Sequence, residues 1–102
     1  MTKIISMMAG EEDFTELLQE FVSEIPERIS RIETAIATED IASLKRIVHQ
    51  LKGACGGYGF PSLTDEAFQL EKVIDSRVST AQFESEIDRF ISNLRLMSAD
   101  SE

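Results

Sequence analysis

Residues 41–60, IASLKRIVHQLKGACGGYGF, predict the fold more clearly than any other stretch of the chain. Apolar side chains recur here every three or four positions, the spacing of one buried face of an α-helix. They are Ile41, Leu44, Ile47, Val48, Leu51, Cys55 and Tyr58. Asp40 is expected to cap the start of this helix. Gly57 and Gly59 lie where a Schellman-type stop would end it before Pro61.

The same spacing extends over nearly the whole chain, and strand signals are almost absent. Pro26 either kinks the first helix or opens a further one at its first position, and Ser79 with Gln82 is typical of a capping box. The expected helices cover residues 11–25, 26–37, 41–58, 61–77 and 79–94. Short turns between helices favour antiparallel neighbours. The sequence therefore predicts an all-α fold, an up-and-down four-helix bundle with a short additional N-terminal helical segment.

The length of 102 residues fits one domain with one hydrophobic core. We expect an N-terminal extension over residues 1–10, the bundle over residues 11–97, and a frayed acidic tail over residues 98–102. The single cysteine, Cys55, lies on the buried stripe and is interpreted as a small hydrophobe in a reducing, cytoplasmic setting. One histidine and one cysteine cannot supply a tetrahedral zinc site, so no metal is expected on this chain.

Composition excludes several classes of partner. The formal net charge of −9 argues against nucleic acid and against an anionic membrane surface, because both would repel the chain. No apolar run is long enough to cross a bilayer, and residues 1–8 are too short and too weakly basic for a signal peptide. The glycine-rich run over residues 53–59 lacks the spacings of nucleotide-binding loops and follows a helix rather than a strand.

His49, the only histidine, is expected on the face of its helix that points away from the core. At 100° per residue it lies about 140° from Leu44 and about 160° from Leu51. The same outward face carries Lys45, Lys52, Gly53 and Gly56. The imidazole is thus expected in solvent, between two lysines, with no side chain one turn C-terminal to it.

This arrangement suits phosphoryl transfer. A neutral imidazole is a good nucleophile near physiological pH, because its ordinary pKa is about 6.5. It can attack phosphorus and carry the group as a phosphoramidate. Lys52 can reach the oxygens of that group as a flexible cation, with Lys45 as a second candidate. Gly53 leaves room for an incoming active site, and Gly56 is expected to act as a further spacer.

The run His49-Gln50-Leu51-Lys52-Gly53, followed by small and glycine-rich residues and by Leu70-Glu71, resembles the histidine-containing phosphotransfer (HPt) domain family. The resemblance implies a four-helix bundle in which His49 accepts a phosphoryl group from a receiver-domain aspartate and passes it to another receiver. It gives Lys52 the role of stabilising the phosphoryl group and Gly53 that of clearance. By position, Gln69 would be a polar residue near the histidine.

The same resemblance implies a phosphoryl carrier without kinase or ATP-binding motifs of its own. Its partners would be response-regulator receiver domains and a hybrid sensor histidine kinase. No cofactor is expected on this chain, and Mg²⁺ would come with the acidic pocket of the receiver.

Two alternatives stay open at this point. The chain could be the phosphotransfer domain of a chemotaxis-type histidine kinase, in which case ATP on a separate catalytic domain would be the first donor. It could also be a helical adaptor that binds a partner without being phosphorylated. The adaptor leaves the shared outward face of His49, Lys52 and Gly53 unexplained.

Overall fold

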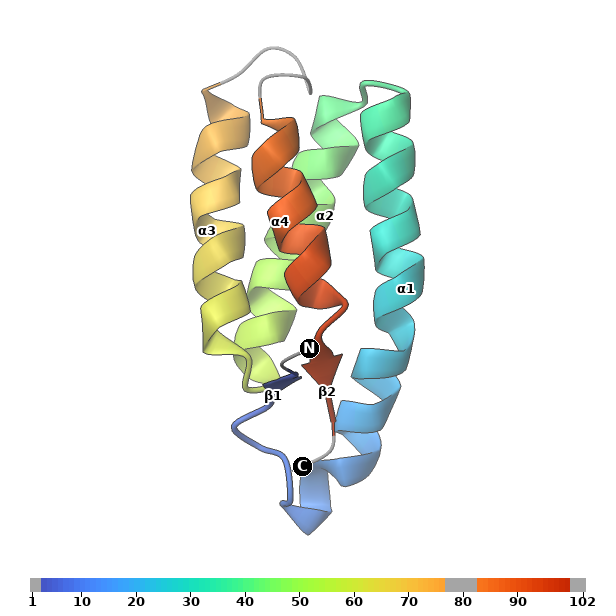
Figure 1. Ribbon diagram of the computed structural model, residues 1–102, viewed down its shortest axis with the longest axis vertical. Coiled ribbons are helices and arrows are strands. Elements are labelled where there is room, and N and C mark those ends of the chain that lie inside the picture. The colour runs from blue at the N-terminus through green and yellow to red at the C-terminus, as the bar shows by residue number, and fades with distance from the viewer. Residues whose placement is uncertain (1–2, 77–82, 100–102) are drawn as a thin grey trace.

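The computed structural model describes residues 3–76 and 83–99, and its helices run alternately up and down beside one another (Figure 1). The four helices are α1 (Thr15–Ala37), α2 (Ile41–Gly57), α3 (Pro61–Asp75) and α4 (Glu84–Leu94). A short 3-10 helix, η1 (Glu12–Phe14), precedes α1. The predicted all-α bundle is confirmed. Among the described helices, none has the length and the apolar composition needed to cross a bilayer.

Pro26 lies inside α1 and does not open a new helix. Of the two alternatives that the sequence left open, a further helix that begins at Pro26 is therefore wrong. The buried stripe continues through the proline with helical spacing, at Phe21, Ile25, Ile29 and Ile32. A proline inside a helix costs about 3 kcal/mol, whereas burying one large apolar side chain contributes about 1.5–3 kcal/mol. The free energy gained by burying one unbroken apolar face exceeds the cost of the lost backbone hydrogen bond.

Both predicted ends of α2 are confirmed. The Asp40 side chain caps the start by accepting a hydrogen bond of 3.1 Å from the Ser43 backbone N–H. At the other end Gly59 has a φ of +81°, the left-handed conformation that favours glycine. The Phe60 N–H donates to the Cys55 carbonyl at 2.8 Å and the Gly59 N–H to the Gly56 carbonyl at 3.4 Å. These two bonds form a Schellman motif, and Pro61 starts α3 directly after it.

A short parallel strand pair below the lower end of α4 was not predicted (Figure 1). Strand β1 (Ile4–Ile5) pairs with β2 (Met97–Ser98), with Ile4 opposite Met97 and Ile5 opposite Ser98. Two residues per strand are too few to produce an alternating pattern. Ser98 is buried in this pair, so the expected frayed tail does not begin at residue 98. Residues 100–102 lie outside the described residues.

The strand pair leads into a segment that holds the α2–α3 turn. Buried Ser6 donates its hydroxyl to the Tyr58 carbonyl at 2.5 Å and accepts a bond from the Met8 N–H. The Met7 N–H donates to the Gly59 carbonyl at 2.8 Å. Residues 6 and 7 are therefore tied to the α2–α3 turn by hydroxyl and backbone hydrogen bonds.

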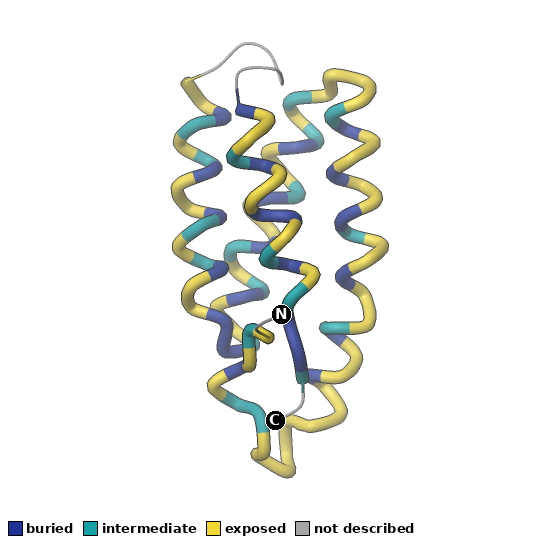
Figure 2. Tube along the Cα trace, in the orientation of Figure 1, coloured by how far each residue is buried: buried dark blue, intermediate teal, exposed yellow. Residues whose placement is uncertain are grey.

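One hydrophobic core runs along the axis of the bundle, and the outward faces are exposed (Figure 2). All four helices contribute to it, and α2 packs most extensively against α3. The described part of α4 begins at Glu84. The expected capping box of Ser79 and Gln82 lies outside the described residues.

We predict that Gly59→Ala lowers the free energy of unfolding by about 2 kcal/mol or more, because alanine is strained at positive φ. A Cβ at residue 59 would also lie 2.7 Å from Ser6 Oγ. The matched control is Gly57→Ala, where a Cβ would meet nothing within 4 Å. It should leave stability unchanged or raise it by up to about 1 kcal/mol. Urea unfolding measures both, and equal effects would contradict the assignment of the turn.

Candidate functional site

His49 lies on the outward face of α2, as its position on the helix predicts. Its side chain is 65% exposed, whereas the preceding Val48 and the nearby Leu51 are fully buried. The helix thus fixes the backbone below the ring through its buried stripe and leaves the imidazole accessible to a second molecule.

Glu71 on α3 holds one nitrogen of this ring. Its Oε2 lies 3.3 Å from His49 Nδ1. A carboxylate only accepts hydrogen bonds, so the contact favours the neutral tautomer whose Nδ1–H donates to Glu71. The lone pair of that tautomer is on Nε2. The nitrogen that can act as a nucleophile is therefore the one that Glu71 does not hold.

Lys52 shares the same carboxylate. Its Nζ lies 2.8 Å from Glu71 Oε1, and the Lys52 and Glu71 side chains are 27% and 14% exposed. Burial raises the pKa of Glu71, but its hydrogen bonds with Lys52 and His49 outweigh burial and hold the pKa below its usual range. Glu71 is thus ionised at neutral pH. One carboxylate positions both the ring and the cation beside it.

The two predicted spacer glycines lie in different surroundings. A Cβ at Gly53 would meet nothing within 4 Å, so packing within the chain does not require glycine there. A Cβ at Gly56 would lie 3.3 Å from Thr64 Oγ1 on α3. The same Thr64 hydroxyl donates to the Lys52 carbonyl at 3.1 Å. Gly56 therefore allows α2 and α3 to approach each other closely, one turn after Lys52.

Two of the expected supporting residues contact other groups. Lys45 Nζ pairs instead with Asp75 Oδ1 of α3 at 2.5 Å, and this hydrogen bond raises the pKa of Lys45. Gln69 lines a groove between α3 and α4 together with Glu86 and Arg89. The polar residue of α3 that contacts His49 is Glu71, which belongs to the Leu70-Glu71 pair of the motif but was not expected in the site.

Cys55 is fully buried on the core side of α2, and burial raises the pKa of its thiol to about 12. It is therefore not ionised at neutral pH and is not available as a nucleophile. Within residues 3–76 and 83–99, no three or more histidine, cysteine or carboxylate side chains are grouped so that they could hold a metal ion.

Comparison with known families identifies the same region. The family model described as the Hpt domain matches residues 16–97, which include nearly all of α1 and the whole of the other three helices. The match contains His49, Lys52, Gly53 and Glu71. No curated protein and no solved structure matched the chain.

We predict that Glu71 makes the free energy of unfolding depend on pH in the acidic range. Its pKa is lower in the folded chain than the ordinary value of about 4.3, so the unfolded chain takes up the proton first. The stabilisation is present above pH about 4.3 and is lost as the pH falls through the lowered pKa. Urea unfolding over this range should show a smaller loss of stability for Glu71→Gln than for the wild type.

The control is Glu16→Gln, which removes an exposed glutamate from the first turn of α1. It should lose stability with falling pH as the wild type does. The role assigned to Glu71 is wrong if Glu71→Gln and Glu16→Gln have the same pH dependence.

Proposed function

Because the chain belongs to the Hpt domain family, whose members carry phosphoryl groups on histidine in two-component signalling, we propose that His49 is the carrier residue of a phosphorelay. It accepts the group from an aspartate of one receiver domain and passes it to an aspartate of another. The observation that carries this proposal is the exposed imidazole with Nδ1 held by Glu71 and Nε2 left to react.

In the proposed transfer, the Nε2 lone pair of His49 attacks phosphorus. The bond from phosphorus to the aspartate oxygen breaks, and the aspartate leaves as a carboxylate. The product ring carries phosphorus on Nε2 and still carries its proton on Nδ1, so it is positively charged. The Glu71 carboxylate beside Nδ1 stabilises that charge. Transfer to the next receiver is the same step in reverse, and no proton has to leave the ring.

Lys52 and Gly53 support this step in different ways. A phosphoryl group brings close to two negative charges at neutral pH, and Lys52 lies one turn along the same face as a cation. Gly53 lies one position further, where a side chain would extend into open space above the helix. We propose that this open space is filled by the edge of the receiver active site.

The partners follow from this chemistry. The receiver supplies the aspartate and its Mg²⁺, and this chain supplies the histidine. A hybrid sensor histidine kinase is a further partner through its own receiver domain. In this role the chain is a carrier without kinase activity and acts in the cytoplasm, where receivers are found. The net charge of −9 disfavours nucleic acid and anionic membranes as partners.

We predict that incubation with a phosphorylated receiver labels this chain on a bond that is labile in acid and stable in base. His49→Gln should take up no label, because glutamine has no nucleophilic nitrogen. Equal labelling of His49→Gln would refute the assignment.

Partner binding and signalling that survive both His49→Ala and Lys52→Ala would favour the adaptor. Labelling by a kinase catalytic domain with ATP, but not by any phosphorylated receiver, would favour a chemotaxis-type kinase domain.

We predict that Gly53→Ala slows transfer from the receiver without weakening the fold. Its added Cβ has space within the chain but would meet the approaching partner. Gly57→Ala is the matched control, since it also adds a methyl group to α2 in open space, one helical turn further along. Rates of label uptake and urea unfolding compare the two variants. If both transfer at the wild-type rate, Gly53 does not provide clearance for the partner.

A further inference from the structure

One large apolar side chain is exposed beside the candidate site. The other large exposed apolar residues in the described part of the chain, Ile5, Met7, Phe14 and Leu17, all lie near the N-terminus. Phe68 lies apart from them on α3, one helical turn before Glu71, and is 45% exposed. A single exposed apolar residue is ordinary, so its surroundings decide whether it has a role.

Two cations approach this ring. Lys72 Nζ lies 4.3 Å from the centroid of Phe68, and Lys52 Nζ lies 5.5 Å from it. Both distances are within the range of a cation–π contact. Lys52 is also the cation that pairs with Glu71 beside His49. Phe68 is thus joined to the reactive histidine through one continuous set of contacts, from the ring to Lys52, to Glu71 and to the imidazole.

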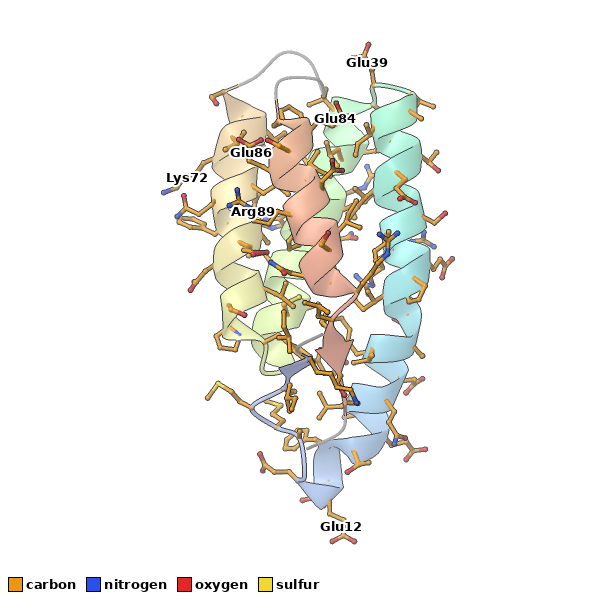
Figure 3. All side chains as sticks on the ribbon, in the orientation of Figure 1. Glu12, Glu39, Lys72, Glu84, Glu86 and Arg89 are labelled. Atoms are coloured by element: carbon orange, nitrogen blue, oxygen red, sulfur yellow. The ribbon has the colours of Figure 1, made fainter. Side chains whose placement is uncertain are left out.

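The charge of this surface differs from that of the chain as a whole. The chain carries 19 acidic and 10 basic residues, yet Lys72 extends outward from α3 (Figure 3) and forms no ion pair with any described residue. Lys52 lies next to the same ring, but its charge is balanced by Glu71, so Lys72 is the cation that gives this surface its positive charge. An apolar ring with a cation on its outer side is complementary to an apolar spot next to carboxylates.

We infer that Phe68 and Lys72 form a docking contact for the receiver domain. The ring covers an apolar spot beside the acidic pocket that holds the receiver's aspartate and Mg²⁺, and Lys72 pairs with a carboxylate at the rim of that pocket. This inference rests on the proposed function, because that function makes the partner an acidic receiver. It adds a contact on α3 to the reactive residues of α2.

The first test measures the rate of label transfer from a phosphorylated receiver as the receiver concentration is raised. Phe68→Ala should raise the half-saturating concentration about tenfold, the usual effect of losing a central interface side chain. The maximal rate should stay unchanged, because the reactive residues are intact. A lower maximal rate with unchanged half-saturation would show that Phe68 acts only by positioning Lys52, and would overturn the docking role.

The matched control is Phe14→Ala, which removes an exposed phenylalanine of η1 at the far end of the molecule. Figure 3 labels Glu12 of the same short helix at that end. Phe14→Ala should transfer with wild-type constants. The docking contact is refuted if Phe68→Ala and Phe14→Ala have the same effect. This holds whether both leave the half-saturating concentration unchanged or both raise it equally.

The second test reverses a charge. Lys72→Glu should raise the half-saturating concentration at low ionic strength, and added salt should reduce the difference from wild type, because salt screens exposed charges. Lys3→Glu makes the same charge change near the N-terminus and should have a smaller effect. Equal effects of the two reversals would mean that net charge, and not a contact at Lys72, governs binding.

These outcomes separate the inference from the function on which it rests. If the wild-type chain takes up no label from any receiver, the proposed function fails. If the wild type is labelled and both Phe68→Ala and Lys72→Glu behave as their controls, only the docking contact fails.

Discussion

The close antiparallel packing of α2 against α3 is the constraint on which the site depends. The Schellman stop at Gly59 reverses the chain within a few residues, and Pro61 starts the next helix at once. Gly56 and Thr64 then allow the two helices to approach each other closely. This packing places Glu71 beside His49 and Asp75 beside Lys45. Without the fixed turn, the histidine would have no carboxylate to select its tautomer.

The N-terminal segment secures that turn from outside the bundle. Ser6 and Met7 bond to the carbonyls of Tyr58 and Gly59, the residues at which the chain reverses. The strand pair β1–β2 then joins the same segment to the end of α4. The absence of a side chain at Gly59 allows the left-handed conformation of the turn. It also leaves room for Ser6, since a Cβ there would lie against the Ser6 hydroxyl. The beginning and the end of the described chain thus support the hairpin that carries the site.

The sequence was sufficient for the buried stripes of the helices and for the outward direction of His49, because both depend on spacing within one helix. It was not sufficient for the partner of His49. The turn determines which part of α3, along its axis, lies opposite the histidine. Gln69 and Glu71 both lie near that part. They flank buried Leu70 by about 100° on either side. Which of the two faces α2 depends on how the helices are arranged around the bundle, and spacing within one helix does not determine this arrangement.

The remaining differences have the same origin in contacts between distant residues. Pro26 lies within α1 because the apolar residues on both sides of it pack into one common core. The tendency of proline to end or begin a helix is a local property and contains no information about that core. The strand pair joins residues more than ninety positions apart through four residues in all, too few to leave a pattern. The contacts of the N-terminal segment could not be predicted either, because the partners of Ser6 and Met7 are carbonyls of the distant α2–α3 turn.

The shared carboxylate of Glu71 bears on how reversible the proposed transfer can be. Before transfer, Lys52 and Glu71 balance each other, and the form of the ring that reacts is the neutral tautomer that Glu71 favours. Transfer adds about two negative charges on the phosphoryl group and one positive charge on the ring, so the site as a whole gains only about one negative charge. Lys52 can then turn toward the phosphoryl oxygens while Glu71 keeps the charged ring. A carrier must release its group as readily as it accepts it, and a site whose net charge changes this little favours neither state strongly.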